Sequence, residues 1–219
     1  HGFEIILIDQ RNHGKSFHAD PFDYETMTED LKKFLDEKKI QKVSLIGHSM
    51  GGKTIMNFIL NYPYYANKVI VVDILPKAYN NDYEKIFNSF SKIDLNNLKS
   101  RNQINDHFSR FFSDHTFVSF LSKNINRDSN GNFKIKFNLN SIKSNILKIT
   151  SAIKTDRVFN EDILFIKGEY SNYIDNQGLL EAKKSFPKLN LVTIENSSHW
   201  IHYENQEKFL IETLSYLRT

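Results

Sequence analysis

Five short apolar runs alternate with stretches of helical character along the chain. The runs are continuous instead of alternating with polar residues, as is typical of strands buried on both faces of a parallel sheet. Strands and helices in alternation predict an α/β protein with a mostly parallel sheet flanked by helices. The predicted strands cover residues 5–8, 43–46, 69–72, 163–166 and 191–194.

Three longer stretches are predicted to be helices. Thr28 can cap a helix over residues 28–39, because its hydroxyl can accept a hydrogen bond from a free backbone N–H. A second helix is predicted over residues 53–62 and should end before Pro63, which cannot continue a helix. A third, over residues 205–217, closes the chain.

The second strand runs directly into a Gly-x-Ser-x-Gly motif, Gly47 to Gly51. A serine between a strand and a helix must adopt a strained backbone, and side chains at the flanking glycines would clash where the chain folds back. The helix N-terminus also directs its dipole and free N–H groups at Ser49. Strand, serine and helix in this order are typical of the nucleophile elbow of α/β-hydrolases. We therefore favour Ser49 as a nucleophile over a chance match in a turn.

A nucleophilic serine needs a base, which is itself oriented by an acid. His199 follows the last predicted strand, where α/β-hydrolases carry their base. His202 lies three residues further on, but nothing else in the sequence completes a metal-ligand set around a His-x-x-His pair. We predict that His199 is the base, that His202 is a structural or rim residue, and that no metal is bound.

Four motifs are spaced along the chain: Asp9-x-Arg11-Asn12-His13-Gly14-Lys15-Ser16, Gly47-His48-Ser49-Met50-Gly51-Gly52-Lys53, Val72-Asp73-Ile74-x-Pro76 and His199-Trp200-Ile201-His202. Together they resemble the YbfF-type esterases of the α/β-hydrolase superfamily and their mitochondrial abhydrolase relatives, in register over residues 5–217. The resemblance implies hydrolysis of carboxylic esters or thioesters of short-to-medium acyl chains, acyl-CoA among them, without a cofactor. The alternatives are a haloperoxidase-like enzyme with the same triad and a ligand-binding protein or pseudoenzyme without turnover.

The position of the acid departs from the commoner pattern of the superfamily. That pattern, Gly-x-x-Asp after the strand at 163–166, reads Gly168-Glu169-Tyr170-Ser171 here. Asp73 ends the third predicted strand, an alternative location for the acid in this superfamily. We predict Asp73 as the acid, with Asp175 and Glu169 as alternatives. Its other interpretation is a helix cap or a hydrogen-bonding loop residue.

The oxyanion donors are predicted to be only partly present. The backbone N–H of Met50 supplies one donor, whereas the superfamily takes the second from a loop after a strand that precedes the Asp9 motif. His1 and Gly2 precede the predicted strand at residues 5–8, so they cannot be the loop that supplies this second donor. We therefore expect a fragment with impaired activity, or else a short natural variant. Asp9 and Arg11 are interpreted as an ion pair and loop anchor.

The pattern changes between residues 76 and 156, where the superfamily places a cap. Short amphipathic segments near residues 83–93, 103–112 and 116–125 predict helices, and residues 130–131 a turn before a short exposed strand at 133–137. We predict a helical cap subdomain over 76–156, inserted into a body made of residues 1–75 and 157–219. The predicted substrate-binding residues are Trp200, Phe87 and Phe111.

Composition narrows the function classes. A chain of 219 residues can bury one core, and a formal net charge of +3 without basic clusters gives no nucleic-acid groove. No apolar run approaches the roughly 20 residues that a membrane span requires. The absence of cysteine excludes disulfides and thiol catalysis. It suits a reducing compartment, so we predict a cytoplasmic protein, or a mitochondrial one if a transit peptide precedes this sequence.

Overall fold

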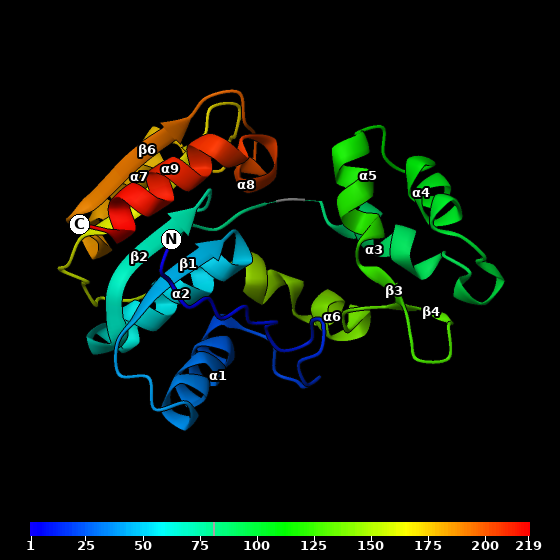
Figure 1. The fold of residues 1–219 in the computed structure, drawn as a ribbon, viewed down its shortest axis with the longest axis horizontal. Coiled ribbons are helices and arrows are strands. Elements are labelled where there is room, and N and C mark those ends of the chain that lie inside the picture. The colour runs from blue at the N-terminus through cyan, green and yellow to red at the C-terminus, as the bar shows by residue number, and fades with distance from the viewer. Residues whose placement is uncertain (81) are drawn as a thin grey trace. The chain divides into compact units, whose positions relative to one another are not determined.

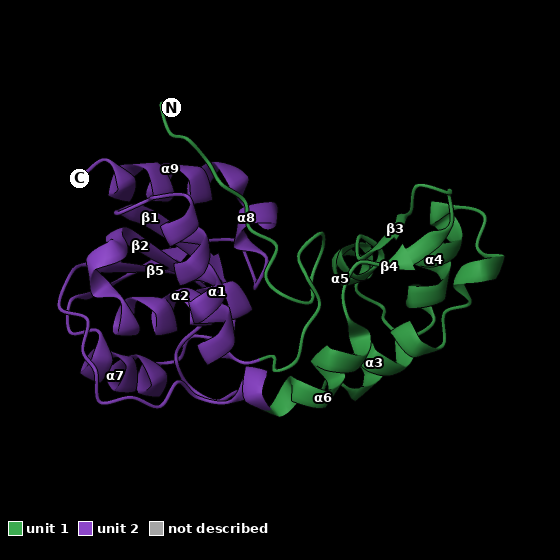
Figure 2. Cartoon of the chain, turned by 90° about the horizontal axis from the view of Figure 1, so that it is seen from below, with its two compact units in different colours: residues 1–22, 80–147 green, residues 23–79, 148–219 purple. Residues whose placement is uncertain are grey.

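The structure is a computed structural model that describes residues 1–80 and 82–219 (Figure 1). The chain forms two compact units, drawn in different colours in Figure 2. Residues 23–79 and 148–219 form one, which we call the sheet unit. Residues 1–22 and 80–147 form the other, which we call the helical unit.

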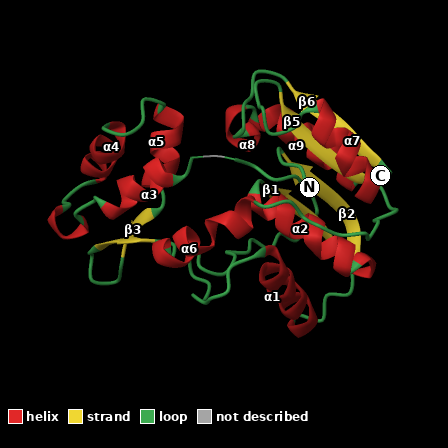
Figure 3. Cartoon of the chain, turned by 180° about the vertical axis from the view of Figure 1, so that it is seen from behind, coloured by secondary structure: helices red, strands yellow, loops and turns green. Residues whose placement is uncertain are grey.

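The sheet unit contains four strands in the order β1-β2-β5-β6, all paired in parallel (Figure 3). Four of the five predicted strands are confirmed, each extended by two or three residues at one end. Their bounds are β1 Val43–His48, β2 Ala66–Val72, β5 Ile163–Gly168 and β6 Leu189–Ile194.

Helices cover both faces of this sheet (Figure 2). Alternate residues of β2 point to opposite faces: Val69 and Val71 join one core cluster, Ile70 and Val72 another. Burial on both faces explains why β2 and β5 read as continuous apolar runs, whereas Ile46 and Leu191 of the edge strands are 48% and 39% exposed. The first face is covered by α1 (Tyr24–Glu37), α2 (Met50–Asn61) and α7 (Asn176–Ser185), and the second by α8 (Ile201–Glu204) and α9 (Gln206–Leu217). A short 3-10 helix, η1 (Pro63–Tyr65), follows α2.

The start of α1 corrects one prediction. The helix begins four residues before Thr28, because Asp23 caps it and forms a capping box with Thr26. The Asp23 carboxylate accepts the Thr26 N–H at 3.0 Å, and the Asp23 N–H donates to the Thr26 hydroxyl at 3.3 Å. Thr28 is instead a buried residue within the helix, whose hydroxyl accepts a hydrogen bond from Asn57 at 2.9 Å.

The strand predicted over residues 5–8 is not formed. Ile5 and Leu7 are 77% and 92% exposed, although the prediction required burial on both faces. A strand is stabilised by a hydrogen-bonded neighbour. Among the described residues, β1 lies at the edge of the sheet and pairs only with β2, so residues 5–8 have no strand beside them.

The helical unit has a core of its own, built largely from aromatic and branched side chains around Phe90 and Phe108. The three helices predicted here are confirmed. The predicted exposed strand is shorter than expected and pairs with β3, and its Phe133 is buried because it packs into this core. The bounds are α3 Glu84–Ser91, η2 Leu95–Asn97, α4 Arg101–Ser109, α5 His115–Ser122, β3 Ile125–Arg127, β4 Phe133–Ile135 and α6 Leu139–Thr150, whose last turn lies in the sheet unit.

The first of the four sequence motifs forms a closed loop within the helical unit. The Asp9 carboxylate accepts the Lys15 N–H at 2.9 Å, and Arg11 donates to the Pro21 carbonyl at 2.7 Å. Asn12 is fully buried and exchanges side-chain hydrogen bonds with the backbone of Ala19. These contacts fit the interpretation of Asp9 and Arg11 as loop anchors.

Candidate active site

Ser49 lies on the sharp turn between β1 and α2. Its φ is 51°, in the left-handed region that side chains disfavour, and its N–H donates to the Val72 carbonyl at 3.0 Å. A Cβ on Gly47 would lie 2.4 Å from the Gly51 carbonyl oxygen, so this approach requires glycine. The strained turn that the motif predicted is therefore present, and Ser49 occupies its apex.

Asp73 occupies the corresponding place on the neighbouring strand. His48 pairs with Val72 in the parallel ladder, so the next residues, Ser49 and Asp73, follow side by side at the carboxyl ends of β1 and β2. The Asp73 N–H extends the ladder by donating to the Ile166 carbonyl at 2.8 Å. Functional groups of open α/β sheets gather at this edge.

Asp73 and His199 are brought together by the fold. The Nδ1 of His199 lies 2.8 Å from Oδ2 of Asp73, which is fully buried. A carboxylate can only accept, so Nδ1 carries the hydrogen and Nε2 of the neutral ring is left to accept a proton. The side chain of His199 itself is 16% exposed and therefore remains accessible.

Ser171, the serine found where an aspartate was expected, contacts the same carboxylate. Its hydroxyl donates to Oδ2 of Asp73, while the Gly168 N–H donates to Oδ1 at 3.2 Å. The Asp73 carboxylate thus accepts three hydrogen bonds, which stabilise its charge in a buried place. The carboxylate therefore comes from Asp73, at the end of β2. Ser171, at the position where the superfamily more often has the acid, donates a hydrogen bond to it.

The ring of His199 is also held by an aromatic neighbour. Tyr173 stacks on it with ring centroids 3.9 Å apart and planes inclined by 17°. The backbone of Tyr173 is fixed in turn, because its N–H donates to the Ser171 hydroxyl at 3.2 Å and its carbonyl accepts from the Tyr79 hydroxyl at 2.9 Å. Burial raises the pKa of Tyr79, so this phenol remains a donor.

The loop that carries His199 packs tightly against the end of β5. The Tyr170 N–H donates to the Ser197 carbonyl at 2.9 Å, and a Cβ on Gly168 would lie 2.1 Å from the Ser198 carbonyl oxygen. On its other side, the Ser198 hydroxyl donates to Glu204 at 2.7 Å. We call residues 195–200 the base loop.

His48 is a neighbour that the sequence did not single out. Its Nε2 lies 2.8 Å from the backbone carbonyl oxygen of His199, and the two rings are 4.5 Å apart. Burial, aided by the nearby His199 and His202, lowers the pKa of His48 to about 3. The only sequence signal was its place inside the serine motif.

The alternative acids have other roles in the structure. Asp175 caps α7 by accepting the Gly178 N–H at 2.6 Å, and its ion pair with Lys77 lowers its pKa. Glu169 accepts the Asn196 N–H at 2.8 Å. Asp73 is therefore the carboxylate that the structure places on His199.

The remaining predicted residues lie in different surroundings. Met50 is the first residue of α2, so its N–H has no partner within the helix. The ring of Trp200 lies 5.4 Å from that of His199. His202 packs edge-on against His48 at 4.9 Å. The two predicted substrate residues of the helical unit are Phe87, which is buried, and Phe111, which contacts His107; their contact with substrate stays a prediction.

Lys53, the last residue of the serine motif, is 2% exposed. Its ammonium group donates to the carbonyls of Lys77, at 3.2 Å, and Ser151, and it lies over the rings of Tyr24 and Tyr79 at 4.9 and 5.6 Å. Burial lowers the pKa of Lys53 to about 8.

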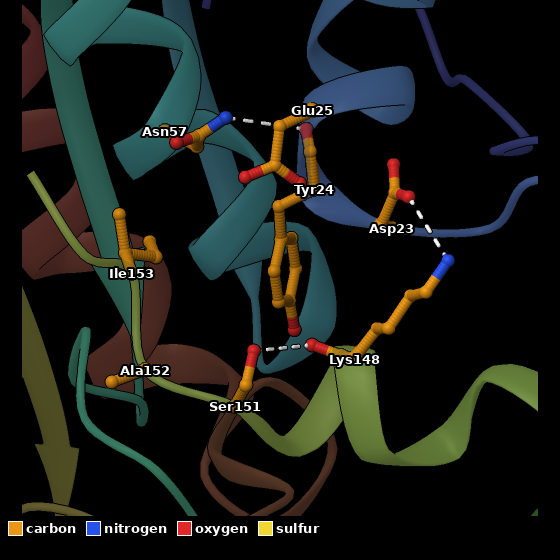
Figure 4. Close-up of a pocket in the computed structure, with 8 residues that line it drawn as sticks. All are labelled: Asp23, Tyr24, Glu25, Asn57, Lys148, Ser151, Ala152 and Ile153. Carbon is orange, nitrogen blue, oxygen red and sulfur yellow. Dashed lines mark hydrogen bonds and ion pairs between the residues drawn. The ribbon is translucent and has the colours of Figure 1, made fainter.

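A separate cavity of about 260 Å³ lies at the start of α1 (Figure 4). Asp23 and Lys148 form an ion pair at 3.5 Å across it, and Ser151 donates to the Lys148 carbonyl at 2.7 Å. Its lining contains neither Ser49, nor Asp73, nor His199. The lining residues are Asp23, Tyr24, Glu25, Asn57, Lys148, Ser151, Ala152 and Ile153.

Within residues 1–80 and 82–219, no three His, Asp or Glu side chains are grouped so that they could hold a metal ion. In the same part of the chain, no helix combines the length and apolar character of a membrane span.

A parallel sheet with a serine elbow at the end of one strand and an Asp–His pair beside it defines an α/β-hydrolase. Comparison with known proteins agrees. Residues 1–206 match the family described as the alpha/beta hydrolase fold. The chain belongs to this family.

Individual relatives are similar over most of their length. The sn-1-specific diacylglycerol lipase ABHD11 of Danio rerio is 30% identical over 99% of this chain and 70% of its own. An abhydrolase domain-containing protein of Schizosaccharomyces pombe is 32% identical over 98% of the chain and 81% of its own. Among solved structures, a marine microorganism esterase superposes with a TM-score of 0.91 at 40% identity, covering 96% of this chain and 83% of that one.

Proposed function

We propose that this protein is a serine esterase that cleaves carboxylic esters or thioesters of short-to-medium acyl chains through an acyl-enzyme. The observation that carries the proposal is the 2.8 Å hydrogen bond from His199 to Asp73. This hydrogen bond leaves Nε2 of His199 as a proton acceptor at the sheet edge where Ser49 also lies. The similarity to a diacylglycerol lipase and to an esterase supports ester bonds as the substrate class.

The proposed reaction uses Ser49, His199, Asp73 and the backbone N–H of Met50. The Ser49 hydroxyl attacks the acyl carbonyl while Nε2 of His199 takes its proton, and the Met50 N–H donates to the oxyanion. The bond to the leaving alcohol or thiol then breaks, and His199 returns the proton to that group. A water molecule releases the acid from Ser49 by the same route. Asp73 keeps the tautomer of His199 and stabilises the imidazolium.

Trp200 is proposed to contact the acyl chain, because it lies beside His199 on the same loop. Phe87 and Phe111 are proposed to contribute further apolar surface. An acyl-CoA is included among the substrates because thioesters follow the same steps as esters.

Labelling with a fluorophosphonate tests the nucleophile directly. The protein should be labelled at Ser49, and Ser49→Ala should abolish both labelling and hydrolysis of p-nitrophenyl acetate. A panel of p-nitrophenyl esters, a diacylglycerol and acyl-CoA of increasing chain length would then define the substrate. Labelling that persists in Ser49→Ala would exclude this residue as the nucleophile. An unlabelled but folded protein would favour a ligand-binding role.

A further inference from the structure

The side chain of His48 connects the nucleophile strand to the base loop. This residue ends β1, immediately before Ser49, and its Nε2 reaches the backbone carbonyl oxygen of His199 at 2.8 Å. The covalent neighbour of the proposed nucleophile is thus hydrogen-bonded to the backbone of the proposed base.

The chemistry of this contact determines the state of His48. A backbone carbonyl can only accept, so Nε2 must carry a hydrogen. In a neutral ring the other nitrogen, Nδ1, then carries no hydrogen. The ring is packed among three others, with centroids 4.5 Å from His199, 5.3 Å from Trp200 and 4.9 Å from His202.

A neutral His48 does not oppose the protonation of His199. In the proposed reaction His199 becomes an imidazolium, and a second cation 4.5 Å away would oppose that change. Burial keeps the pKa of His48 at about 3, well below that of an ordinary histidine. His48 can therefore donate its hydrogen bond without carrying charge throughout the pH range in which an esterase works.

We propose that His48 is a positioning residue, which fixes the His199 backbone and so aligns the imidazole between Asp73 and Ser49. The proposal rests on the proposed function for its catalytic consequence, although the alignment itself can be observed without turnover. His199 is then held at three points: Nδ1 by Asp73, the ring face by Tyr173, and the backbone carbonyl by His48.

Two substitutions separate the hydrogen bond from the bulk of the ring. His48→Phe keeps an aromatic ring but removes the donor. His48→Gln keeps an N–H donor at a similar distance from the backbone. We expect His48→Phe to lower kcat by about 10–100-fold with KM changed less than about threefold, because a displacement of about 1 Å can have this effect. His48→Gln should retain kcat within about threefold of the wild-type value.

A spectroscopic signature reports alignment independently of rate. The His199 Nδ1 hydrogen shared with Asp73 should give a far-downfield proton NMR signal, which Asp73→Asn identifies by its loss. His48→Phe should broaden or remove that signal, and His48→Gln should keep it. His107→Phe is a matched control, because Nε2 of His107 is also bonded to a backbone carbonyl, that of Ser89, at 2.8 Å; the signal should be unchanged there.

The outcomes distinguish the two proposals. A folded His48→Phe that keeps both the wild-type kcat and the downfield signal would overturn the positioning role. So would a folded His48→Gln that is as impaired as a folded His48→Phe. If His48→Phe does not fold, a folded His48→Gln that loses about tenfold or more in kcat together with the downfield signal would overturn the role, and one that keeps both would support it. A wild-type protein that resists fluorophosphonate at Ser49 would refute the esterase function, while the NMR comparison would still test the alignment of His199.

Discussion

Ser49 and Asp73 both adopt a left-handed backbone, with φ of 51° and 50°. Residues other than glycine seldom hold this conformation, which costs on the order of 1–3 kcal/mol unless the surroundings impose it. Here each residue follows directly on a parallel strand, and each N–H still extends the ladder, to Val72 and to Ile166. Both strained residues therefore lie at the sheet edge where the proposed chemistry takes place.

Two of the three candidate acids, Asp73 and Asp175, should respond differently to the same substitution. Asp73→Asn should lower kcat for p-nitrophenyl acetate by about 10³–10⁴-fold, because an amide cannot hold the required tautomer of His199 or stabilise its charge. Asp175→Asn should leave kcat within a few-fold of the wild type, since asparagine also caps helices. The reverse result, with Asp175→Asn the impaired variant, would show that Asp175 and not Asp73 is the acid.

His48 should make the protein sensitive to mild acid. In the unfolded chain this histidine takes up a proton below about pH 6.5, whereas in the folded protein it does so only near its pKa of about 3. The unfolded state therefore binds more protons in this window, and the free energy of unfolding falls as the pH falls. Between pH 7.5 and 5 the loss due to His48 should be about 2 kcal/mol.

Urea unfolding of the wild type and of His48→Gln at both pH values isolates this contribution. His199 and His202, whose rings face His48, are present in both proteins, so their own titration largely cancels in the comparison. Equal losses of stability in the two proteins would mean that His48 takes up its proton normally in the folded state.

Much of the site could be predicted from local sequence. Strand, glycine and helix signals surround Ser49 and predict its role, and the place of His199 after the last strand predicts that of the base. Ser171 is visible in the sequence as a departure from a pattern, but its bond to Asp73 depends on two strands meeting in space. His48 and Tyr173 carry no signal of their own, because each acts through a contact with a residue more than 25 positions away.

Among the elements, prediction succeeded where the determinants were local. Four apolar runs form the strands β1, β2, β5 and β6, and the central pair, β2 and β5, is buried on both faces as the pattern predicts. Residues 5–8 have the same apolar pattern but no strand beside them, and this condition cannot be read from the run itself. The start of α1 is an exception, because Thr28 is a possible cap but the local capping box of Asp23 and Thr26 starts the helix earlier.

Because β5 and the base loop are in close contact, adding one methyl group at Gly168 should disturb the site. Gly168→Ala would place a Cβ 2.1 Å from the Ser198 carbonyl oxygen and 2.8 Å from that of Ser197, so the base loop must move. A shift of about 1 Å should lower kcat by about 100-fold. Overpacking should also reduce the free energy of unfolding by about 1–3 kcal/mol.

Gly131→Ala provides the control for the Gly168 variant. That glycine has a φ of 84° and nothing within 4 Å of an added Cβ, so alanine there adds backbone strain but no steric clash. It should reduce stability while kcat stays near the wild-type value. A Gly168→Ala protein with normal kcat would indicate that the base loop is not confined by β5.

At the scale of the whole chain, the backbone passes between the two units three times, at residues 22–23, 79–80 and 147–148. The segments at the last two of these crossings are joined inside the sheet unit. The Tyr79 N–H donates to the Thr150 carbonyl at 2.9 Å, and the Ile153 N–H donates to the Pro76 carbonyl at 2.8 Å. Lys53 of α2 binds both crossings through the Lys77 and Ser151 carbonyls. The helix that starts at the proposed nucleophile therefore also holds the two segments through which the chain leaves and re-enters this unit.

The buried charge of Lys53 should appear in the stability of the whole protein. Its pKa of about 8 in the folded state lies well below the usual 10.4 or so, and the unfolded chain holds the proton over the interval between these values. The free energy of unfolding due to this group therefore rises with pH in that interval. From pH 7.5 to 9.5 the wild type should gain about 2 kcal/mol relative to Lys53→Met.

Denaturant unfolding of both proteins at these two pH values measures the gain. Buried tyrosines such as Tyr79, whose pKa is raised, are common to both proteins, and their effect cancels in the difference. Lys53→Met should also weaken the attachment of the two crossings, which would appear as faster limited proteolysis at residues 76–80 or 148–153. A stability difference independent of pH would mean that Lys53 keeps an ordinary pKa and that its ammonium group reaches solvent.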